Sequence, residues 1–293
     1  AAIIAGGVYA TLCPDHAKSL GIDLVIQGEN LDPLWQMLNI EPDAYQPPLW
    51  EAYDKLTAGV MKLTNGCPFA CTYCASDKVA GRFAVRNIDH TIEDLQFLLS
   101  CGVTDIAFYD DALLYKPQDA LMPFAEYVIE KNINVNFHTP NALHARFITP
   151  RIAEVMVNAG FKTFYLGFES WSETFHEATG AKVVSDELRC ATQNLVNAGA
   201  DKKNITAYEM LGHPQSNLQQ LQESMRFVNS LGISVMLSDF SPIPGTCDGD
   251  LCEKWVNLAE PLCHNKSAFP IIALGEDKVN YYKDLCKKLN ANT

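Results

Sequence analysis

The stretch GVMKLTNGCPFACTYCAS, residues 59–76, joins a short apolar run to three cysteines at the spacing C-x-x-x-C-x-x-C. The run, residues 59–66, predicts a β-strand because short apolar runs between helical stretches are typical of strands. Cys67, Cys71 and Cys74 therefore lie on the loop that leaves the carboxyl end of this strand. In a barrel of parallel strands, active sites form at that edge.

The same pattern of an apolar run followed by an amphipathic stretch repeats along the chain. Further runs occupy residues 105–111, 134–140, 163–170, 204–211 and 234–242. The stretches between them have helical periodicity, and Ser185 and Asn217 are the expected N-caps of two of these helices. Repeated strand–helix alternation predicts an α/β fold with a parallel sheet of right-handed units. A length of about 190 residues suits a partial (β/α)6 TIM-like barrel better than a closed eightfold one.

We expect three segments along the chain. Residues 1–56 hold a small α/β fragment and a connecting segment, which Pro33, Pro42, Pro47 and Pro48 are expected to keep free of regular structure. Residues 57–246 form the partial barrel, and residues 247–293 form an extension that caps it. Because the chain begins with AAIIAGG rather than Met, apparently inside a strand, a further N-terminal portion is expected to precede it.

The composition is that of a globular enzyme, with 48% apolar residues and a formal net charge of -13. Nucleic acid is a disfavoured partner because no Lys/Arg run exceeds two residues, whereas phosphate backbones bind basic surfaces. The apolar runs are too short to cross a bilayer, and no export signal opens the sequence. We therefore expect a cytoplasmic protein, in which closely spaced thiols bind metal rather than form disulfides.

Three thiols in one loop are an unusual ligand set. Thiolates bind iron–sulfur clusters and zinc, but a structural zinc site takes four ligands. The next cysteine along the chain is Cys101, 27 residues beyond Cys74. Three protein ligands on a [4Fe–4S] cluster leave one iron open to a small molecule. Zinc binding and a plain electron-transfer cluster, in a non-catalytic carrier or a zinc-stabilised binding protein, remain alternatives.

The cysteine spacing, with Tyr73 before the last cysteine, resembles the cluster motif of the radical S-adenosylmethionine (SAM) superfamily. The resemblance covers about residues 58–246. It implies an enzyme in which the open iron binds SAM, and reductive cleavage of SAM yields a 5′-deoxyadenosyl radical. That radical abstracts hydrogen from a small-molecule substrate, which the sequence does not identify. A flavodoxin or ferredoxin would be the electron donor.

The resemblance also implies SAM-binding residues at the carboxyl ends of successive strands. Asp110 or Asp111 would bind the methionine amino group, although the family often has Gly-Gly-Glu there. The other expected SAM-binding residues are Glu169 or Ser170 for the ribose, Lys182 for the carboxylate, and Gly212 and Ile243 for the adenine. The carboxylates of Glu209 and Asp239 point either into the barrel or towards the helices, because the strand period alone does not fix the side.

Two further features bear on cofactors. Residues 6–29 resemble the last strand–helix–strand portion of the cobalamin-binding domain that precedes the barrel in one branch of the superfamily. Cobalamin-dependent radical methyl transfer is therefore an alternative function, but the D-x-H-x-x-G motif of many such domains is absent from this sequence. Cys247, Cys252 and Cys263 either bind an auxiliary cluster or are ordinary thiols.

Overall fold

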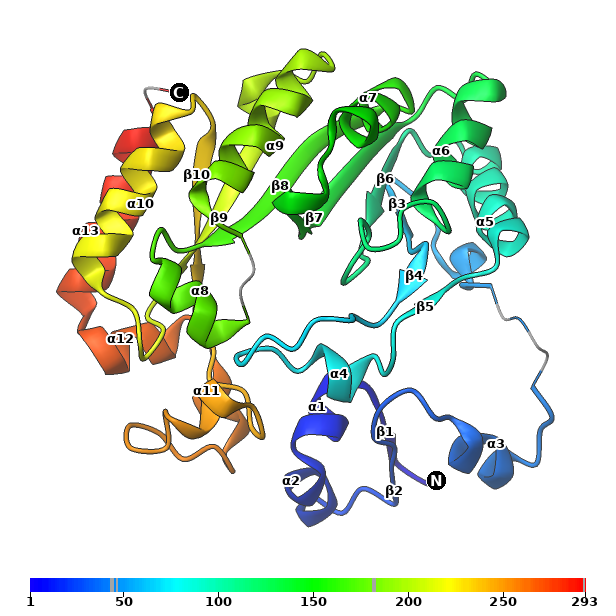
Figure 1. The fold of residues 1–293 in the computed structure, drawn as a ribbon. Helices are drawn as coiled ribbons and strands as arrows, with labels where there is room; N and C mark the ends of the chain where they lie inside the picture. Colours follow the sequence, from blue (N-terminus) through cyan, green and yellow to red (C-terminus); the bar gives the residue numbers. More distant parts are fainter. Residues whose placement is uncertain (43–44, 46, 181–182, 292) are drawn as a thin grey trace.

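The structure is a computed structural model that describes residues 1–42, 45, 47–180, 183–291 and 293. Its main element is a six-stranded sheet in which neighbouring strands are parallel (Figure 1). The strands follow chain order across the sheet: β3 (Gly59–Met61), β6 (Asp105–Phe108), β7 (Asn136–His144), β8 (Phe161–Glu169), β9 (Ile205–Leu211) and β10 (Ser234–Asp239). Strands β3 and β10 are the two edges of this sheet. Within the described residues they do not pair with each other, so the barrel is open, which confirms the predicted partial barrel.

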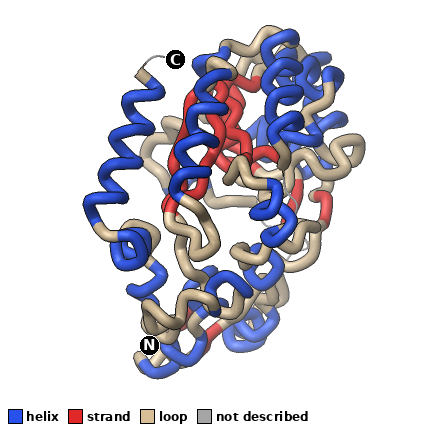
Figure 2. Tube along the Cα trace, turned by 60° about the vertical axis from the view of Figure 1, so that its left-hand side comes forward, coloured by secondary structure: helices blue, strands red, loops and turns tan. Residues whose placement is uncertain are grey.

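Helices connect successive strands and cover the outer face of the sheet (Figures 1 and 2). They are α5 (Ile88–Ser100), α6 (Leu121–Glu130), α7 (Pro150–Asn158), α9 (Ser185–Asn197) and α10 (Leu218–Ser230). A longer helix near the end of the chain, α13 (Glu276–Asn290), packs against β10 and α10. These helices begin and end within a few residues of the amphipathic stretches in the sequence.

The hydrophobic core lies between the sheet and these helices. In β9, alternate residues such as Ile205, Ala207 and Leu211 are buried against the helices, while Tyr208 and Met210 remain half-buried on the opposite, concave face. Successive side chains of a strand point to opposite faces, so one face builds the core and the other lines an open interior. Function is therefore expected on the concave face and at the carboxyl ends of its strands.

Smaller elements gather beyond the carboxyl ends of the strands, in the lower half of Figure 1. The first sheet of two strands pairs β1 with β2, and the second pairs β4 with β5. The bounds of these elements are β1 (Ile4–Ala5), α1 (Gly7–Leu12), α2 (Pro14–Ser19), β2 (Leu24–Val25), α3 (Asp32–Leu38), β4 (Thr64–Asn65), α4 (Ser76–Val79), β5 (Ala84–Val85), α8 (Glu173–Thr179), α11 (Cys247–Asp250) and α12 (Ala268–Leu274). Short 3-10 turns lie at Trp50–Ala52, Ala145–Phe147, Lys202–Asn204 and Pro261–His264.

Three local predictions need correction. The run at residues 59–66 does not form one strand, because it is divided into β3 and β4, and β4 pairs with β5 outside the central sheet. The connecting segment contains a helix, α3, because Pro33 lies in its first turn, where the missing N–H of proline costs nothing. Ser185 is the first residue of α9 rather than its N-cap. The residue before it, Val184, takes that position, and its N–H donates to the Glu187 carboxylate at 3.0 Å. The other expected cap is confirmed, since the Asn217 side chain accepts from two backbone N–H groups of α10.

None of the helices in the described part of the chain combines the length and apolar character needed to cross a bilayer.

Candidate active site

The three cysteines of the motif lie on the loop between β4 and α4. The loop begins with a sharp turn at Gly66, which has a φ of +67°. A Cβ at this position would come within 2.8 Å of the backbone oxygens of Gly81 and Arg82. Only glycine permits this turn, which directs the following residues across the carboxyl edge of the sheet.

Cys67, Cys71 and Cys74 share the wall of one cavity of about 80 Å³. All three side chains are half-buried. The pKa of Cys67 is raised to about 11, chiefly by burial; a backbone hydrogen bond at Phe69 lowers it, and the nearby Cys74, Cys71 and Asp111 contribute to the rise. Three thiolates around one cavity would repel one another, and bound cationic iron would relieve that repulsion. This donor set fits an iron–sulfur cluster.

Within the described ranges, no three His, Cys, Asp or Glu side chains are arranged to hold one metal ion.

The structure gives the two aspartates after β6 different surroundings. Asp110 is buried, and its Oδ1 accepts from Leu63 N (2.9 Å), Thr64 N (2.6 Å) and Thr64 Oγ1 (2.7 Å). Burial raises its pKa to about 6 despite these hydrogen bonds. Asp111 instead lines the cysteine cavity. Neither residue caps α6, whose N-cap is Ala120. Asp110 thus fixes the strand end before the cysteines, and Asp111 is the aspartate placed to meet a ligand.

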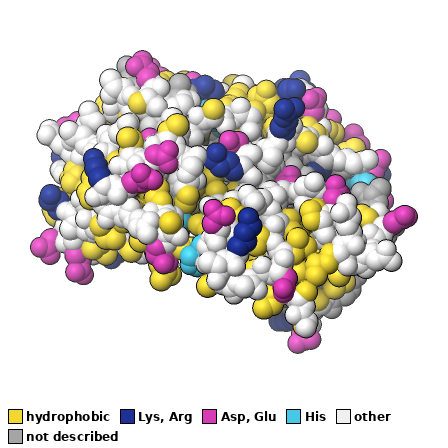
Figure 3. Space-filling view, turned by 90° about the horizontal axis from the view of Figure 1, so that it is seen from below, with side chains coloured by type: hydrophobic (Ala, Val, Ile, Leu, Met, Phe, Trp, Pro, Cys, Tyr) yellow, Lys and Arg dark blue, Asp and Glu magenta, His cyan; other side chains and the backbone are white. Residues whose placement is uncertain are grey.

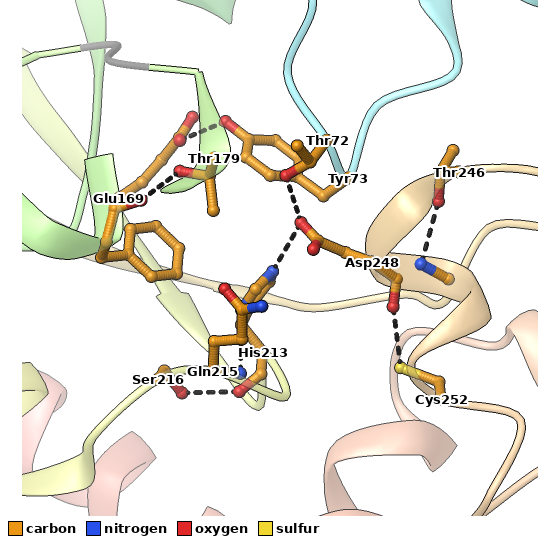
Figure 4. Close-up of polar contacts among 12 residues, drawn as sticks. Thr72, Tyr73, Glu169, Thr179, His213, Gln215, Ser216, Thr246, Asp248 and Cys252 are labelled. Carbon is orange, nitrogen blue, oxygen red and sulfur yellow. Dashed lines mark hydrogen bonds and ion pairs between the residues drawn. The ribbon is translucent and has the colours of Figure 1, made fainter. Parts of the chain in front are cut away.

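Glu169 ends β8 in an unusual conformation. Its φ of +70° is in the left-handed region, and the pairing with β9 shifts register just before it. Left-handed backbone costs a non-glycine residue about 1–2 kcal/mol, and such strain is concentrated at functional sites. The buried Glu169 carboxylate accepts a hydrogen bond from the Tyr73 hydroxyl (Figure 4). Burial and this carboxylate both raise the pKa of Tyr73.

A larger cavity of about 540 Å³ adjoins the cysteine cavity. Tyr73, Cys74 and Ala142 line both cavities. The larger one extends along the carboxyl ends of β7 to β10 and is also lined by Asn141, Glu169, Tyr208, Met236, Ser238, Ile243 and Lys266. Its volume is in the range of small-molecule sites, and its lining is mostly apolar with a few polar groups. The two cavities together form one site with a thiol-lined end.

The other predicted SAM-binding residues are placed as follows. Ile243 lines the larger cavity. Ser170 belongs to the turn after β8, where its Oγ accepts from Ser172 N at 3.1 Å and its carbonyl oxygen contacts His176 Nε2. Gly212 has a φ of +90°, and a Cβ there would lie 2.9 Å from Pro270. The backbone at Gly212 therefore packs closely against α12. The contact of Gly212 with adenine stays a prediction. Lys182 lies outside the described residues.

The carboxylates of Glu209 and Asp239 face the helices. Both residues border the larger cavity, but Glu209 Oε1 accepts from Ser224 Oγ in α10 at 2.7 Å. Asp239 forms an ion pair of 2.7 Å with Lys283 in α13. Burial raises the pKa of Glu209 to about 8, with a smaller contribution from the Glu169 charge. Neither carboxylate is therefore directed at a ligand on the concave face.

The cysteines after the barrel do not join the cysteine cavity. Cys252 is buried and donates to the Asp248 carbonyl oxygen at 3.2 Å, while Cys247 is exposed and Cys263 is half-buried. Sequence reasoning missed Asp248, which contacts the cysteine loop, and Lys266, which lines the larger cavity. Both come from the C-terminal extension, where the sequence has no regular pattern that would have placed them.

The chain belongs to the radical SAM superfamily. The model of that family matches residues 61–228, more than half of the chain, which confirms the predicted family. Members of this superfamily are enzymes that use a [4Fe–4S] cluster and SAM.

Individual relatives transfer methyl or methylthio groups according to their names. The chain is 24% identical over 278 residues to bacteriochlorophyllide d C-12(1)-methyltransferase of Chlorobaculum tepidum, a match that covers 83% of this chain and 58% of that protein. It is 24% identical over 274 residues to the threonylcarbamoyladenosine tRNA methylthiotransferase MtaB of Thermotoga maritima, covering 84% of this chain and 60% of that protein.

The fold is similar to that of TsrM from Kitasatospora setae, a radical SAM methyltransferase solved with tryptophan and a SAM analogue. The TM-score is 0.71 at 13% identity, and the match covers 87% of this chain and 58% of TsrM. A second structure of TsrM contains cobalamin and a [4Fe–4S] cluster. The likeness to the cobalamin-containing branch is thus confirmed for the fold, and the chain spans less than two thirds of the length of each of these proteins.

Proposed function

We propose that this chain is a radical SAM enzyme that abstracts hydrogen from a small organic substrate. Cys67, Cys71 and Cys74 hold the [4Fe–4S] cluster, and SAM and the substrate occupy the adjoining larger cavity. The observation that carries the proposal is the joining of the two cavities at the carboxyl edge of the sheet. A thiol-bound cluster at one end would lie directly beside a bound small molecule at the other.

When bound, the cluster supplies one electron, obtained from a flavodoxin or ferredoxin, that splits SAM into methionine and the 5′-deoxyadenosyl radical. The substrate would supply the hydrogen atom that converts this radical into 5′-deoxyadenosine. The side chains of the site bind and orient the reactants. Asp111 accepts from the methionine amino group, Glu169 accepts from the ribose hydroxyls, and Ile243 contacts the adenine. The apolar part of the lining limits access of water to the radical.

Cobalamin-dependent methyl transfer is a second candidate. It is favoured by the fold shared with TsrM, which includes most of this chain, and by the methyltransferase among the relatives. We propose that residues 1–56 belong to the end of a domain that precedes the barrel, that residues 57–246 are the catalytic barrel, and that residues 247–293 complete it. Under this candidate, a longer natural chain would bind cobalamin.

We propose a small molecule rather than tRNA as the substrate. On the face shown in Figure 3, Lys and Arg side chains are scattered among acidic and apolar ones. With a formal net charge of -13, the chain has little electrostatic attraction for phosphate backbones. The larger cavity, at about 540 Å³, also has the size of a small-molecule site.

The test is anaerobic reconstitution with iron and sulfide, followed by addition of SAM and dithionite. We expect the 5′-deoxyadenosine yield to depend on the cluster, and Cys67→Ala to abolish it. Cys101→Ala, which removes an exposed cysteine outside the site, should leave it unchanged. S-adenosylhomocysteine together with cobalt in the full-length protein would instead favour methyl transfer. A protein that purifies with zinc and takes up no iron would overturn the proposal.

A further inference from the structure

A polar cluster made of half-buried Thr72 and buried His213 and Asp248 joins the cysteine loop to the C-terminal extension (Figure 4). Thr72 Oγ1 donates to Asp248 Oδ2 at 2.5 Å, and His213 Nε2 lies 3.0 Å from the same oxygen. Thr72 lies on the cysteine loop, His213 lies in the segment after β9, and Asp248 lies in α11. This cluster therefore connects parts of the chain that are 35 to 176 residues apart in sequence.

The hydrogen bonds define the state of the histidine. Gln215 N donates to His213 Nδ1 at 3.2 Å, so Nδ1 is an acceptor and Nε2 carries the proton that is donated to Asp248. Burial lowers the pKa of His213, although Asp248 raises it in part, and a neutral imidazole agrees with this pattern. The rings of Phe175 and Phe240 meet the imidazole edge to face at 4.9 and 4.8 Å. His213 is thus a fixed donor in an aromatic setting.

Thr72 is held by its backbone as well as its side chain. Thr72 N donates to Thr179 O at 3.2 Å, and Thr72 O accepts from Asp248 N at 3.2 Å. The next residue, Tyr73, is bonded to Glu169. Thr72 and Tyr73, the two residues between the ligands Cys71 and Cys74, therefore both donate hydrogen bonds to carboxylates from distant elements. A buried carboxylate is costly unless it is hydrogen-bonded, so Asp248 favours the arrangement that brings it two donors.

We propose that Asp248 and His213 are positioning residues for the cluster, acting through the Thr72 hydroxyl. His213 orients the Asp248 carboxylate, and that carboxylate fixes Thr72, which sets the relative positions of Cys71 and Cys74. The inference rests on the proposed function in taking these cysteines as cluster ligands. Through Asp248, the C-terminal extension would be part of the active site as well as a cover for the barrel.

The test compares four single variants and one double variant. Thr72→Val removes the hydroxyl at nearly constant volume, and Thr72→Ser retains it. Asp248→Asn weakens the acceptor, and Asp250→Asn is the matched control because Asp250 is exposed on the same short helix. The first readout is the alkylation rate of Cys71 and Cys74 in the cluster-free full chain, with exposed Cys101 as the internal reference. The second is the rate at which a chelator removes iron from the reconstituted protein.

We expect Thr72→Val and Asp248→Asn to raise both rates about tenfold, the factor that loss of one hydrogen bond to a charged group permits. Thr72→Ser and Asp250→Asn should stay within about twofold of the unmodified chain. The double variant Thr72→Val/Asp248→Asn should be no faster than either single one, because both remove the same interaction. The electron paramagnetic resonance spectrum of the reduced cluster with SAM should change in the two affected variants only.

Unchanged alkylation in Thr72→Val and Asp248→Asn would overturn the inference, as would equal effects of Thr72→Val and Thr72→Ser. An effect of Asp250→Asn as large as that of Asp248→Asn would show general loosening of α11 and would overturn it too. The alkylation measurement needs no cluster, so it decides the positioning role even if the unmodified chain takes up no iron. That last result would count against the proposed function alone.

Discussion

At the residue scale, the site is organised by carboxylates that differ in what they contact. Asp110 accepts three hydrogen bonds from Leu63 and Thr64, whereas Asp111 lines the cysteine cavity. Glu169 occupies a strained backbone position and lines the larger cavity. The Glu209 carboxylate is buried and accepts from Ser224 in α10, so we expect it to affect stability.

Glu169→Gln should weaken SAM binding about tenfold, because an amide is a poorer acceptor for the ribose hydroxyls than a carboxylate. The dissociation constant of SAM is measured by equilibrium dialysis with the reconstituted protein. Glu177→Gln, an exposed change on α8, is the control. Equal affinities in the two variants would remove Glu169 from the proposed SAM site.

Glu209 should make the fold less stable as pH rises. Its pKa is raised from 4.5 to about 8 in the folded chain, so the folded state binds the proton more tightly than the unfolded state does. Stability is then lost between about pH 4.5 and 8, by about 1 kcal/mol or more. Urea unfolding of the cluster-free chain at pH 5.5 and 8 should show a smaller loss in Glu209→Gln. Exposed Glu223→Gln should behave like the unmodified chain, and an equal loss in all three would contradict the prediction.

Among the smaller elements, the glycine turn before the cysteines has a restrictive geometry. Gly66 and Gly102 both have positive φ, but only Gly66 faces backbone atoms that a Cβ would strike. An alanine at Gly102 would meet only the cost of a left-handed backbone, whereas an alanine at Gly66 would also meet the cost of a clash. The loop that follows Gly66 contains all three proposed ligands, so any shift of the turn moves them together.

Gly66→Ala should therefore be much more damaging than Gly102→Ala. The Gly102 change should cost about 1–2 kcal/mol in unfolding free energy and leave iron uptake intact. The Gly66 change adds the clash at 2.8 Å and should reduce iron bound after reconstitution several-fold. Thermal unfolding and iron analysis provide the two measurements. Comparable iron content in both variants would show that the turn does not set the ligand positions.

The elements themselves were largely predictable, because periodicity is a local signal. The run at 204–211 coincides with β9 to within one residue, and Asn217 caps α10 as expected. The sequence did not reveal α3, since proline was interpreted as a breaker and Pro33 lies where a helix tolerates it. The contact of Thr72 with Asp248 was also out of reach. It depends on how two loops meet 176 residues apart, and no spacing rule describes that.

At the scale of the whole molecule, the open barrel explains why the site is divided. The sheet ends at β3 and β10, so its concave face keeps a cavity instead of a filled interior. The cysteine loop covers one end of that cavity. Ile243, from the segment after β10, lines it from the other side, and the C-terminal extension contributes Lys266 and the support of Asp248. The active site is thus built from the whole length of the barrel and from the segment after it.

The three thiols of the cysteine loop are proposed to leave one iron of the cluster open to SAM. This proposal is tested most directly by electron–nuclear double resonance on the reduced cluster, with SAM labelled with ¹⁵N in its amino group and ¹⁷O in its carboxylate. We predict hyperfine coupling of both labels to the cluster in the unmodified chain and in Cys101→Ala. A reconstituted cluster that shows no coupling to saturating labelled SAM would contradict the account.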